Sequence, residues 1–293
     1  MRFRVLHTTR YRYESAVALC QNEARLAPRD LPGQRCQRWE LDIAPEPADL
    51  RSRYDYYGNR VVYFAVERRH QDLVISATSD VEVLPAGPEL DFSGQVPWDE
   101  LRETLRRGHE PTHLEARDAM YPSPQVPHLH TAARFALRSF PRGRPLLEAV
   151  AHLMERIHGE FSYQPGFTNI ATPLQEVFRH RRGVCQDFAH LAIACLRAIG
   201  LPARYVSGYL ETQAPPQGDK LVGADASHAW CSVYLPGGVW LDFDPTNNQF
   251  PGQRYITLAV GRDYGDVAPV KGIVLSSGKH KLAVAVDVRR LGP

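Results

Sequence analysis

The hydrophobic pattern of the first 85 or so residues is typical of β-strands. Apolar and polar side chains alternate over residues 39–43 and again over 74–84, with the period of a half-buried strand. Gly58-Asn59 lies between the short run Tyr54–Tyr57 and a second apolar run, and such a dipeptide between two runs predicts a hairpin. We therefore expect a small antiparallel β domain over residues 1–85.

The segment 86–145 loses this alternation and is rich in proline and glycine. Short helices are expected within it over residues 98–107, 114–120 and 130–139. We interpret the segment as a helical connector that packs on the region that follows.

The pattern then changes to the period of a helix. Residues 146–157 predict an amphipathic helix, and the segment Thr172–Gln175 has the residue order of a capping box at a helix start. A longer helix is expected after Gly183 and ends at Gly200. Its apolar positions recur with the spacing of one buried stripe: Phe188, Leu191, Ala192, Cys195, Leu196 and Ile199.

Strand patterns return after this helix. They cover residues 203–210, 229–235, 239–243, 256–260 and 282–288. A helix followed by antiparallel strands is typical of the α+β class. The sequence therefore predicts an α+β chain with three regions: a β domain (1–85), a helical connector (86–145) and a C-terminal domain (146–293).

Composition and charge fit an ordinary globular protein. The chain has 43% hydrophobic and 23% charged residues and a net charge of +2, so no strong field favours nucleic acid or an anionic membrane. No run approaches a membrane span in length, and the first residues contain no apolar run of the signal-peptide kind. The five cysteines are an odd number in a chain too large to need disulfide staples. We expect a cytoplasmic protein with free thiols.

Among these thiols, Cys185 has the position best suited to chemistry. It comes two residues after Gly183, at the expected start of the helix, where unpaired N–H groups and the helix dipole favour a thiolate. The glycine permits a sharp turn and the close approach of a substrate carbonyl. The alternative is a buried structural cysteine, the ordinary case for a lone thiol. Cys195, on the apolar stripe of the same helix, fits that description.

A strand-pairing argument connects a histidine with an aspartate. If Leu235 pairs with Val239 across a three-residue loop, His228 and Asp244 become diagonal neighbours on one face, within reach of a hydrogen bond. A two-residue loop would instead place the two side chains on opposite faces of the hairpin. Asp242 shares the face and is the second candidate. The other interpretation is a strand-end histidine and a turn aspartate before proline.

Four motifs resemble the core of bacterial transglutaminase-like proteins: GVCQDFAH (183–190), GLPARYVSGY (200–209), SHAW (227–230) and FDPTN (243–247). The N-terminal motifs HTTRY and DYYGN resemble the β domain that precedes this core in many bacterial members, and GRDYGDV resembles a segment that often follows it. The resemblance implies a papain-like (cysteine-peptidase-like) fold with a triad. Cys185 is then the nucleophile, His228 the base and Asp244 the acid that orients the histidine.

Three further side chains are candidates near this triad. The resemblance implies that Tyr163 lines an aromatic edge of the cleft. Gln186 follows the nucleophile and is a candidate for ordering the helix start. Trp230 shares the His228 face of its strand and is a candidate wall of the site. For each of the three, plain packing or capping is the alternative.

These residues predict thiol-dependent acyl chemistry on amide or peptide bonds, with a thioester intermediate and hydrolysis as the expected outcome. The alternatives are transfer from protein glutamine to an amine (transglutaminase cross-linking), a zinc enzyme, and a non-catalytic interaction protein that keeps the fold. We expect no cofactor and no metal, because no cysteine pair has zinc-site spacing and nothing resembles a calcium loop. The expected partner is a peptide or protein amide substrate, without nucleic acid or membrane; the oligomeric state is not predicted.

Overall fold

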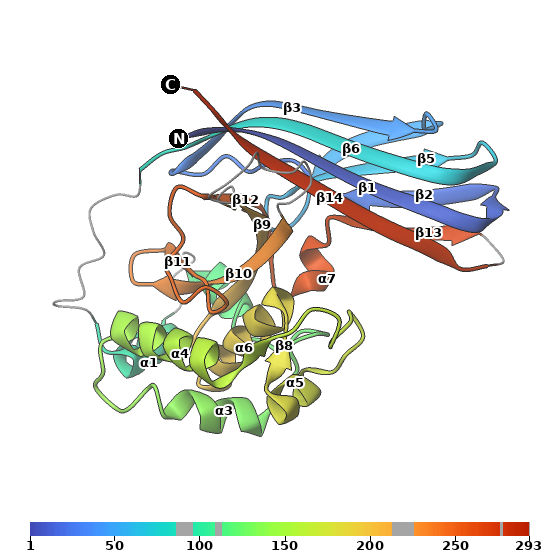
Figure 1. Cartoon of the computed structure of the whole chain (residues 1–293). Helices are drawn as coiled ribbons and strands as arrows, with labels where there is room; N and C mark the ends of the chain where they lie inside the picture. Colours follow the sequence, from blue (N-terminus) through green and yellow to red (C-terminus); the bar gives the residue numbers. More distant parts are fainter. Residues whose placement is uncertain (86–95, 109–112, 213–225, 276–277, 293) are drawn as a thin grey trace, which may run out of the picture.

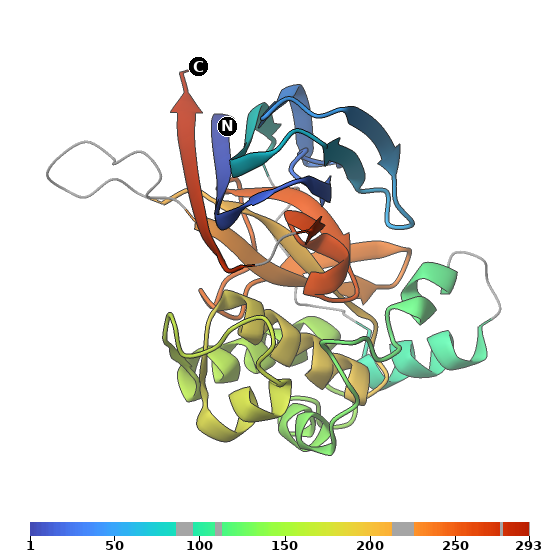
Figure 2. The ribbon, with the colours of Figure 1, turned by 90° about the vertical axis from the view of Figure 1, so that its right-hand side faces the viewer.

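The computed structural model describes residues 1–85, 96–108, 113–212, 226–275 and 278–292. A four-stranded sheet lies in the middle of the molecule, with a β-sandwich on one side and most of the helices on the other (Figure 1 and Figure 2). This arrangement confirms the α+β class and the N-terminal β domain expected from the sequence.

The β-sandwich combines strands from both ends of the chain. They are β1 (Arg2–Val17), β2 (Leu19–Ala24), β3 (Gln34–Ala44), β4 (Asp49–Tyr54), β5 (Arg60–Val66), β6 (His70–Val83), β13 (Val270–Leu275) and β14 (His280–Leu291). One sheet has the order β14-β1-β6-β3 and the other the order β13-β2-β5-β4. Buried side chains such as Val17, Phe64 and Ile75 form the core between them.

The predicted hairpin is present, although one strand ends earlier than expected. β4 pairs with β5 up to Tyr54 and Arg60, and Gly58 takes a positive φ of 73° in the turn. Residues 55–57, predicted to continue the strand, belong to the turn. The reason is the Asp55 carboxylate, which accepts hydrogen bonds from the backbone N–H groups of Tyr57 and Asn59 and so closes the loop.

The last two strands return to the beginning of the chain. β13 pairs antiparallel with β2, and β14 pairs antiparallel with β1 from Arg2–Leu291 to Tyr13–His280. Residues 270–291 therefore add strands to the sheets of the N-terminal region, although they lie within the predicted range 146–293. The divisions at 85 and 145 remain predictions.

The central sheet has the order β11-β10-β9-β12, with antiparallel neighbours. Its strands are β9 (Ala203–Leu210), β10 (Ala226–Leu235), β11 (Val239–Phe243) and β12 (Tyr255–Gly261). The bounds of β9 and β11 are those predicted, and the other two strands are longer than predicted.

Most of the helices cover the face of the central sheet that lies away from the sandwich (Figure 1). The helices and the two short strands among them are α1 (Trp98–Arg107), α2 (Leu114–Asp118), α3 (His130–Leu137), α4 (Leu146–Glu160), β7 (Ser162–Tyr163), α5 (Leu174–His180), β8 (Arg182–Gly183), α6 (Cys185–Ala198) and α7 (Tyr264–Val267). The apolar stripe of α6 is buried as predicted, and Leu191 and Leu196 are fully inaccessible. Within the described ranges, no helix has the length and apolar character needed to cross a bilayer.

The capping box predicted for α5 is wrong. The helix begins at Leu174, and Pro173 occupies the cap position without a side-chain hydrogen bond. The hydroxyl of Thr172 instead accepts a hydrogen bond from the backbone N–H of Asn169 at 3.0 Å. Thr172 therefore stabilises the preceding turn, which competes for the same side chain.

Two side-chain amides of the sandwich attach to the outer edge of β12. Gln34 exchanges hydrogen bonds of 2.8 Å with the N–H and C=O of Thr257. Asn59 does the same with Val260, at 2.8 and 2.9 Å. Each amide replaces one residue of a neighbouring strand, so the edge of the central sheet is held by the sandwich.

Candidate active site

Cys185 is the first residue of α6, and Val184 before it is extended, with φ −119° and ψ −178°. The thiol therefore lies where the first backbone N–H groups of a helix have no intrahelical acceptor. Cys185 is partly exposed, in contrast to the fully buried Cys195 of the same helix. This confirms the predicted position of Cys185 at a helix start.

The start of α6 is fixed by the carboxylate of Asp187. Its Oδ2 accepts hydrogen bonds from the backbone N–H of Val184 at 2.8 Å and from the hydroxyl of Thr168 at 2.5 Å. A Cβ on Gly183 would lie 2.7 Å from this oxygen, so the turn requires glycine. Burial raises the pKa of Asp187, although the two donors oppose the shift.

The hairpin of β10 and β11 has the register assumed in the sequence argument. Leu235 pairs with Val239 across the loop Pro236–Gly238, and pairing continues to Cys231 and Phe243. His228 Nε2 lies 2.7 Å from Asp244 Oδ2, which confirms the expected contact between the two side chains. Since Nε2 faces the carboxylate, Nδ1 is the ring nitrogen left for the sulfur of Cys185, to which His228 is also hydrogen-bonded.

The protonation of His228 follows from these two contacts. Burial by itself would lower the pKa of the imidazole. Hydrogen bonds to Asp244 and Cys185 outweigh burial and raise the pKa of His228 to about 9. The ring therefore carries a positive charge at neutral pH, between a carboxylate and a sulfur atom.

Asp244 is completely buried and receives a dense set of donors. Its Oδ1 accepts from the backbone N–H of Thr246 at 2.8 Å, and its Oδ2 accepts from Asn247 Nδ2 at 2.6 Å and from the Tyr255 hydroxyl at 2.7 Å, besides His228. Burial would raise the pKa of Asp244, but these hydrogen bonds lower it overall. The carboxylate therefore stays ionised.

Sequence reasoning did not find Asn247 or Tyr255. Asn247 follows Asp244 within the FDPTN motif, so its proximity was a usable signal. Tyr255 begins β12 at the far edge of the sheet, and no local pattern connects it with β11.

The second candidate aspartate, Asp242, has other partners. Its Oδ2 accepts from Trp230 Nε1 at 2.9 Å, and its Oδ1 accepts from the hydroxyl of Ser232. Trp230 is fully buried, and its ring centroid lies 6.1 Å from that of His228. A Cβ on Gly208 would lie 2.4 Å from the Trp230 ring, so glycine in β9 makes room for this ring.

Tyr163 lies near the sulfur of Cys185, and Gln186 follows Cys185 in α6. Tyr163 pairs with Gly183 through the short strands β7 and β8, and its ring packs edge-on against Phe188. Burial and the nearby sulfur of Cys185 raise the pKa of Tyr163, which is 55% exposed. Tyr163 therefore lies at the rim of the thiol site. The roles of Tyr163, Gln186 and Trp230 remain predictions.

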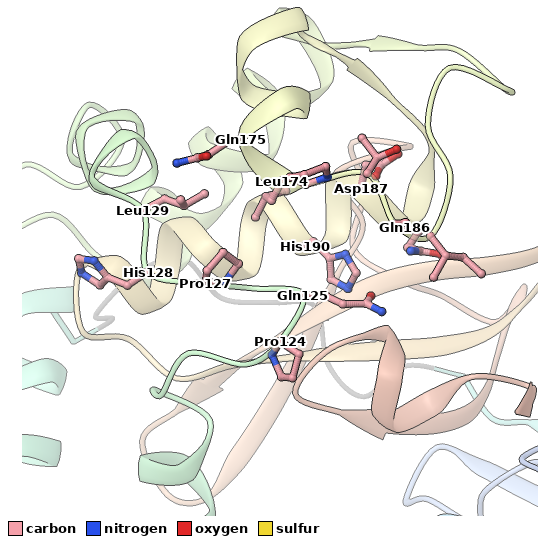
Figure 3. Close-up of a pocket in the computed structure, with 14 residues that line it drawn as sticks. Pro124, Gln125, Pro127, His128, Leu129, Leu174, Gln175, Gln186, Asp187 and His190 are labelled. Carbon is pink, nitrogen blue, oxygen red and sulfur yellow. The ribbon is translucent and has the colours of Figure 1, made fainter.

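Gln186, the residue after Cys185, lines a cavity of about 580 Å³, whereas Cys185, His228 and Asp244 are not among its described lining residues. Figure 3 shows Gln186, Asp187 and His190 of α6 on one side of it and the segment from Pro124 to Leu129 on the other. His190 is uncharged at neutral pH, because burial lowers its pKa to about 4, and its Nε2 accepts from the Tyr264 backbone N–H. Among the described residues that line this cavity there is no lysine or arginine.

The other thiols have different surroundings. Burial raises the pKa of all four of them: Cys20, Cys36, Cys195 and Cys231. Cys231 donates to the carbonyl of Ala189 on α6. Among the described residues, no three His, Cys, Asp or Glu side chains lie close enough together to hold a metal ion.

Two segments of the chain match known families. Residues 3–82 match the bacterial transglutaminase-like N-terminal region, and residues 136–245 match the transglutaminase-like superfamily. The second segment contains Cys185, His228 and Asp244.

Several proteins are similar in sequence or structure. An uncharacterized protein of Mycobacterium tuberculosis is 44% identical over 98% of this chain and 92% of its own length, and one of Mycobacterium leprae is 34% identical over 99% of both. The protein-glutamine gamma-glutamyltransferase of Pseudomonas aeruginosa is 36% identical over 35% of this chain and 16% of its own length. The crystal structure of a "Putative Cysteine Protease from Cytophaga hutchinsonii" has a TM-score of 0.74 at 21% identity and covers 100% of this chain and 91% of its own. The fold is therefore shared with that structure. The chain belongs to the transglutaminase-like superfamily and begins with the bacterial transglutaminase-like N-terminal region.

Proposed function

We propose that the protein carries out thiol-dependent acyl chemistry on amide or peptide bonds, with Cys185 as nucleophile, His228 as base and Asp244 as the acid that orients the base. The observation that carries this proposal is the continuous chain of contacts from Cys185 through His228 to Asp244. Membership of the superfamily supports thiol chemistry in general. The geometry and charge of the three side chains support these specific roles.

The reaction begins with the pair formed by the Cys185 thiolate and the His228 imidazolium. The sulfur attacks the amide carbonyl, a C–S bond forms, and the C–N bond breaks as His228 gives its proton to the leaving amine. Water then attacks the thioester, neutral His228 takes one of its protons, and the acid and the thiolate are released. Asp244 remains ionised and compensates the imidazolium charge.

The start of α6 supplies electrostatic stabilisation for the reaction. The backbone N–H of Cys185 heads the helix, where such groups stabilise an oxyanion on the attacked carbonyl. Asp187 withdraws the neighbouring N–H of Val184 from this task and holds the turn in one conformation. The turn is thus set before the substrate binds.

A peptide or protein amide is the substrate class that we propose. Tyr163 is an exposed aromatic side chain near the sulfur of Cys185, and Gln186, the next residue of α6, lines a cavity. The described residues that line this cavity carry amide, imidazole and aliphatic groups and the Asp187 carboxylate, but no lysine or arginine. Amide and apolar groups of this kind suit a stretch of polypeptide.

The test is a library of peptides and simple amides, with the release of amine as readout and Cys185→Ala as control. We expect release by the wild type and none by the variant. Equal release by both proteins would refute the role of Cys185. Failure of a thiol-reactive probe to label Cys185 in the folded protein would favour the non-catalytic alternative.

We further propose that hydrolysis prevails over transfer to an amine. Transfer requires that the amine be held in place or that water be excluded, and the thiol site has the partly exposed Cys185 at its surface. The name of the Pseudomonas aeruginosa relative favours transfer as the second candidate. Both products are measured on one reactive amide with increasing primary amine. Transfer that exceeds hydrolysis at millimolar amine would replace the hydrolase proposal.

A further inference from the structure

Three strands contribute to the environment of one carboxylate oxygen. Asp244 Oδ2, just after β11, accepts from His228 of β10 and from Tyr255, the first residue of β12. In the central sheet β12 and β10 are not neighbours, because β9 lies between them. The Tyr255 side chain therefore reaches across β9 to the same oxygen that holds the base.

The direction of the Tyr255 hydroxyl is set by Gln249. Gln249 Nε2 lies 2.6 Å from the Tyr255 oxygen, and an amide nitrogen only donates. The hydroxyl accepts from Gln249, and its own proton is left for Asp244 at 2.7 Å. Gln249 is itself fixed by backbone hydrogen bonds with Asp244 in both directions, at 2.9 and 3.3 Å.

Tyr255 is held rigidly in this role. Its side chain is buried, and its ring meets Trp230 edge-on, with centroids 5.3 Å apart. Burial and the charge of Asp244 raise the pKa of the phenol, so Tyr255 remains a protonated donor over the whole working range of pH. Its strand is attached to the β-sandwich through Gln34 and Asn59.

We infer that Tyr255 is a positioning residue of the thiol site: its hydroxyl, directed by Gln249, fixes Asp244 and shares the negative charge that Asp244 presents to His228. The inference deepens the proposed function and rests on it. Tyr255 acts through Asp244, so it affects the sulfur of Cys185 only by changing how tightly His228 holds its proton.

The ionisable groups around His228 allow this effect to be isolated. The ring faces Cys185 from α6, Asp244 after β11 and Tyr255 from β12. Asp242 of β11 accepts hydrogen bonds from Trp230 and Ser232 instead. Without the Tyr255 hydroxyl, the Asp244 carboxylate keeps more of its negative charge. This charge stabilises the His228 imidazolium, which then holds its proton more tightly.

The experiment measures the rate of iodoacetamide alkylation of Cys185 against pH and needs no substrate. In the wild type we expect a step in the rate where His228 loses its proton, near pH 9. In Tyr255→Phe we expect this step to move upward by about half a pH unit. The matched control is Tyr209→Phe, which removes a buried hydroxyl from β9 that bonds His7 away from the thiol site. In this control, the alkylation rate should change at the same pH as in the wild type.

Two further variants test whether the effect passes through Asp244. In an Asp244→Asn background, Tyr255→Phe should cause no additional shift, because the acceptor charge is already lost. Gln249→Met keeps the phenol but frees its proton, and we expect a smaller upward shift. This variant also provides the test if Tyr255→Phe does not fold.

The outcomes separate the two proposals. A wild-type step near pH 9 that is unchanged in both Tyr255→Phe and Gln249→Met overturns the inference and leaves the proposed function intact. Equal shifts with and without the Asp244 charge also overturn it, because Tyr255 would then act independently. A wild type without any such step overturns both.

Discussion

The space in front of Gly183 is filled by Asp187, which makes Gly183→Ala a sharp perturbation of the thiol site. The added Cβ would lie 2.7 Å from Asp187 Oδ2 and 2.8 Å from its Cβ. Contacts this short displace the carboxylate, and with it the hydrogen bonds from Val184 N–H and Thr168. The first turn of α6, with Cys185 at its head, then loses the side chain that fixes it.

The magnitude follows from these contacts. Overpacking of a buried site costs about 1–3 kcal/mol. Each lost hydrogen bond to a carboxylate costs about 1.5–3 kcal/mol, part of which returns as the displaced group meets water. We expect a loss of about 2–4 kcal/mol in the free energy of unfolding, or about 4–8 °C in Tm for a chain of this size.

The assay combines thermal unfolding, followed by circular dichroism, with the alkylation rate of Cys185. Gly159→Ala is the control, because Gly159 lies in α4 with no atom within 4 Å of an added Cβ and alanine is the better helix former. We expect an unchanged or higher Tm for the control, and a lower Tm with slower alkylation for Gly183→Ala. A Gly183→Ala protein with wild-type Tm and wild-type alkylation would refute the reasoning.

The remaining predictions concern the candidate triad. Cys185 should be alkylated before the other thiols between about pH 5 and pH 9, since burial raises the pKa of the others; mass-spectrometric mapping that finds Cys36 labelled first would contradict this. Cys185→Ala should abolish turnover, His228→Ala should leave a trace and Asp244→Ala somewhat more, because nucleophile and base act as a unit. Turnover retained in Asp244→Ala but lost in Asp242→Ala would assign the orienting role to the other aspartate. The raised pKa of His228 contributes stability that is fully present below pH 6.5 and is lost as the pH rises through about 9. Urea unfolding of wild type and His228→Ala should therefore differ most at low pH and converge at high pH, and a constant difference would argue against the ion pair.

Helices and strands whose bounds depend on residues close in the sequence could be predicted. The bounds of α1, β9 and β11 agree with those predicted from the local sequence pattern. The predictions failed where a polar side chain competed for the backbone. Asp55 closes a turn where a strand was expected, and Thr172 stabilises a turn where a helix cap was expected.

The sequence by itself determined the position of Cys185 at a helix start. It joined His228 to Asp244 on the condition of a three-residue loop, which the register of β10 and β11 fulfils. Both depend on short stretches of chain, in which the helical period and a three-residue loop leave little freedom. Only the tertiary structure decided that His228 meets Cys185, that Tyr255 reaches Asp244 across β9, and that the last strands pair with the first. Backbone hydrogen-bonding groups are chemically alike along the chain, so local sequence does not specify which distant strands they join.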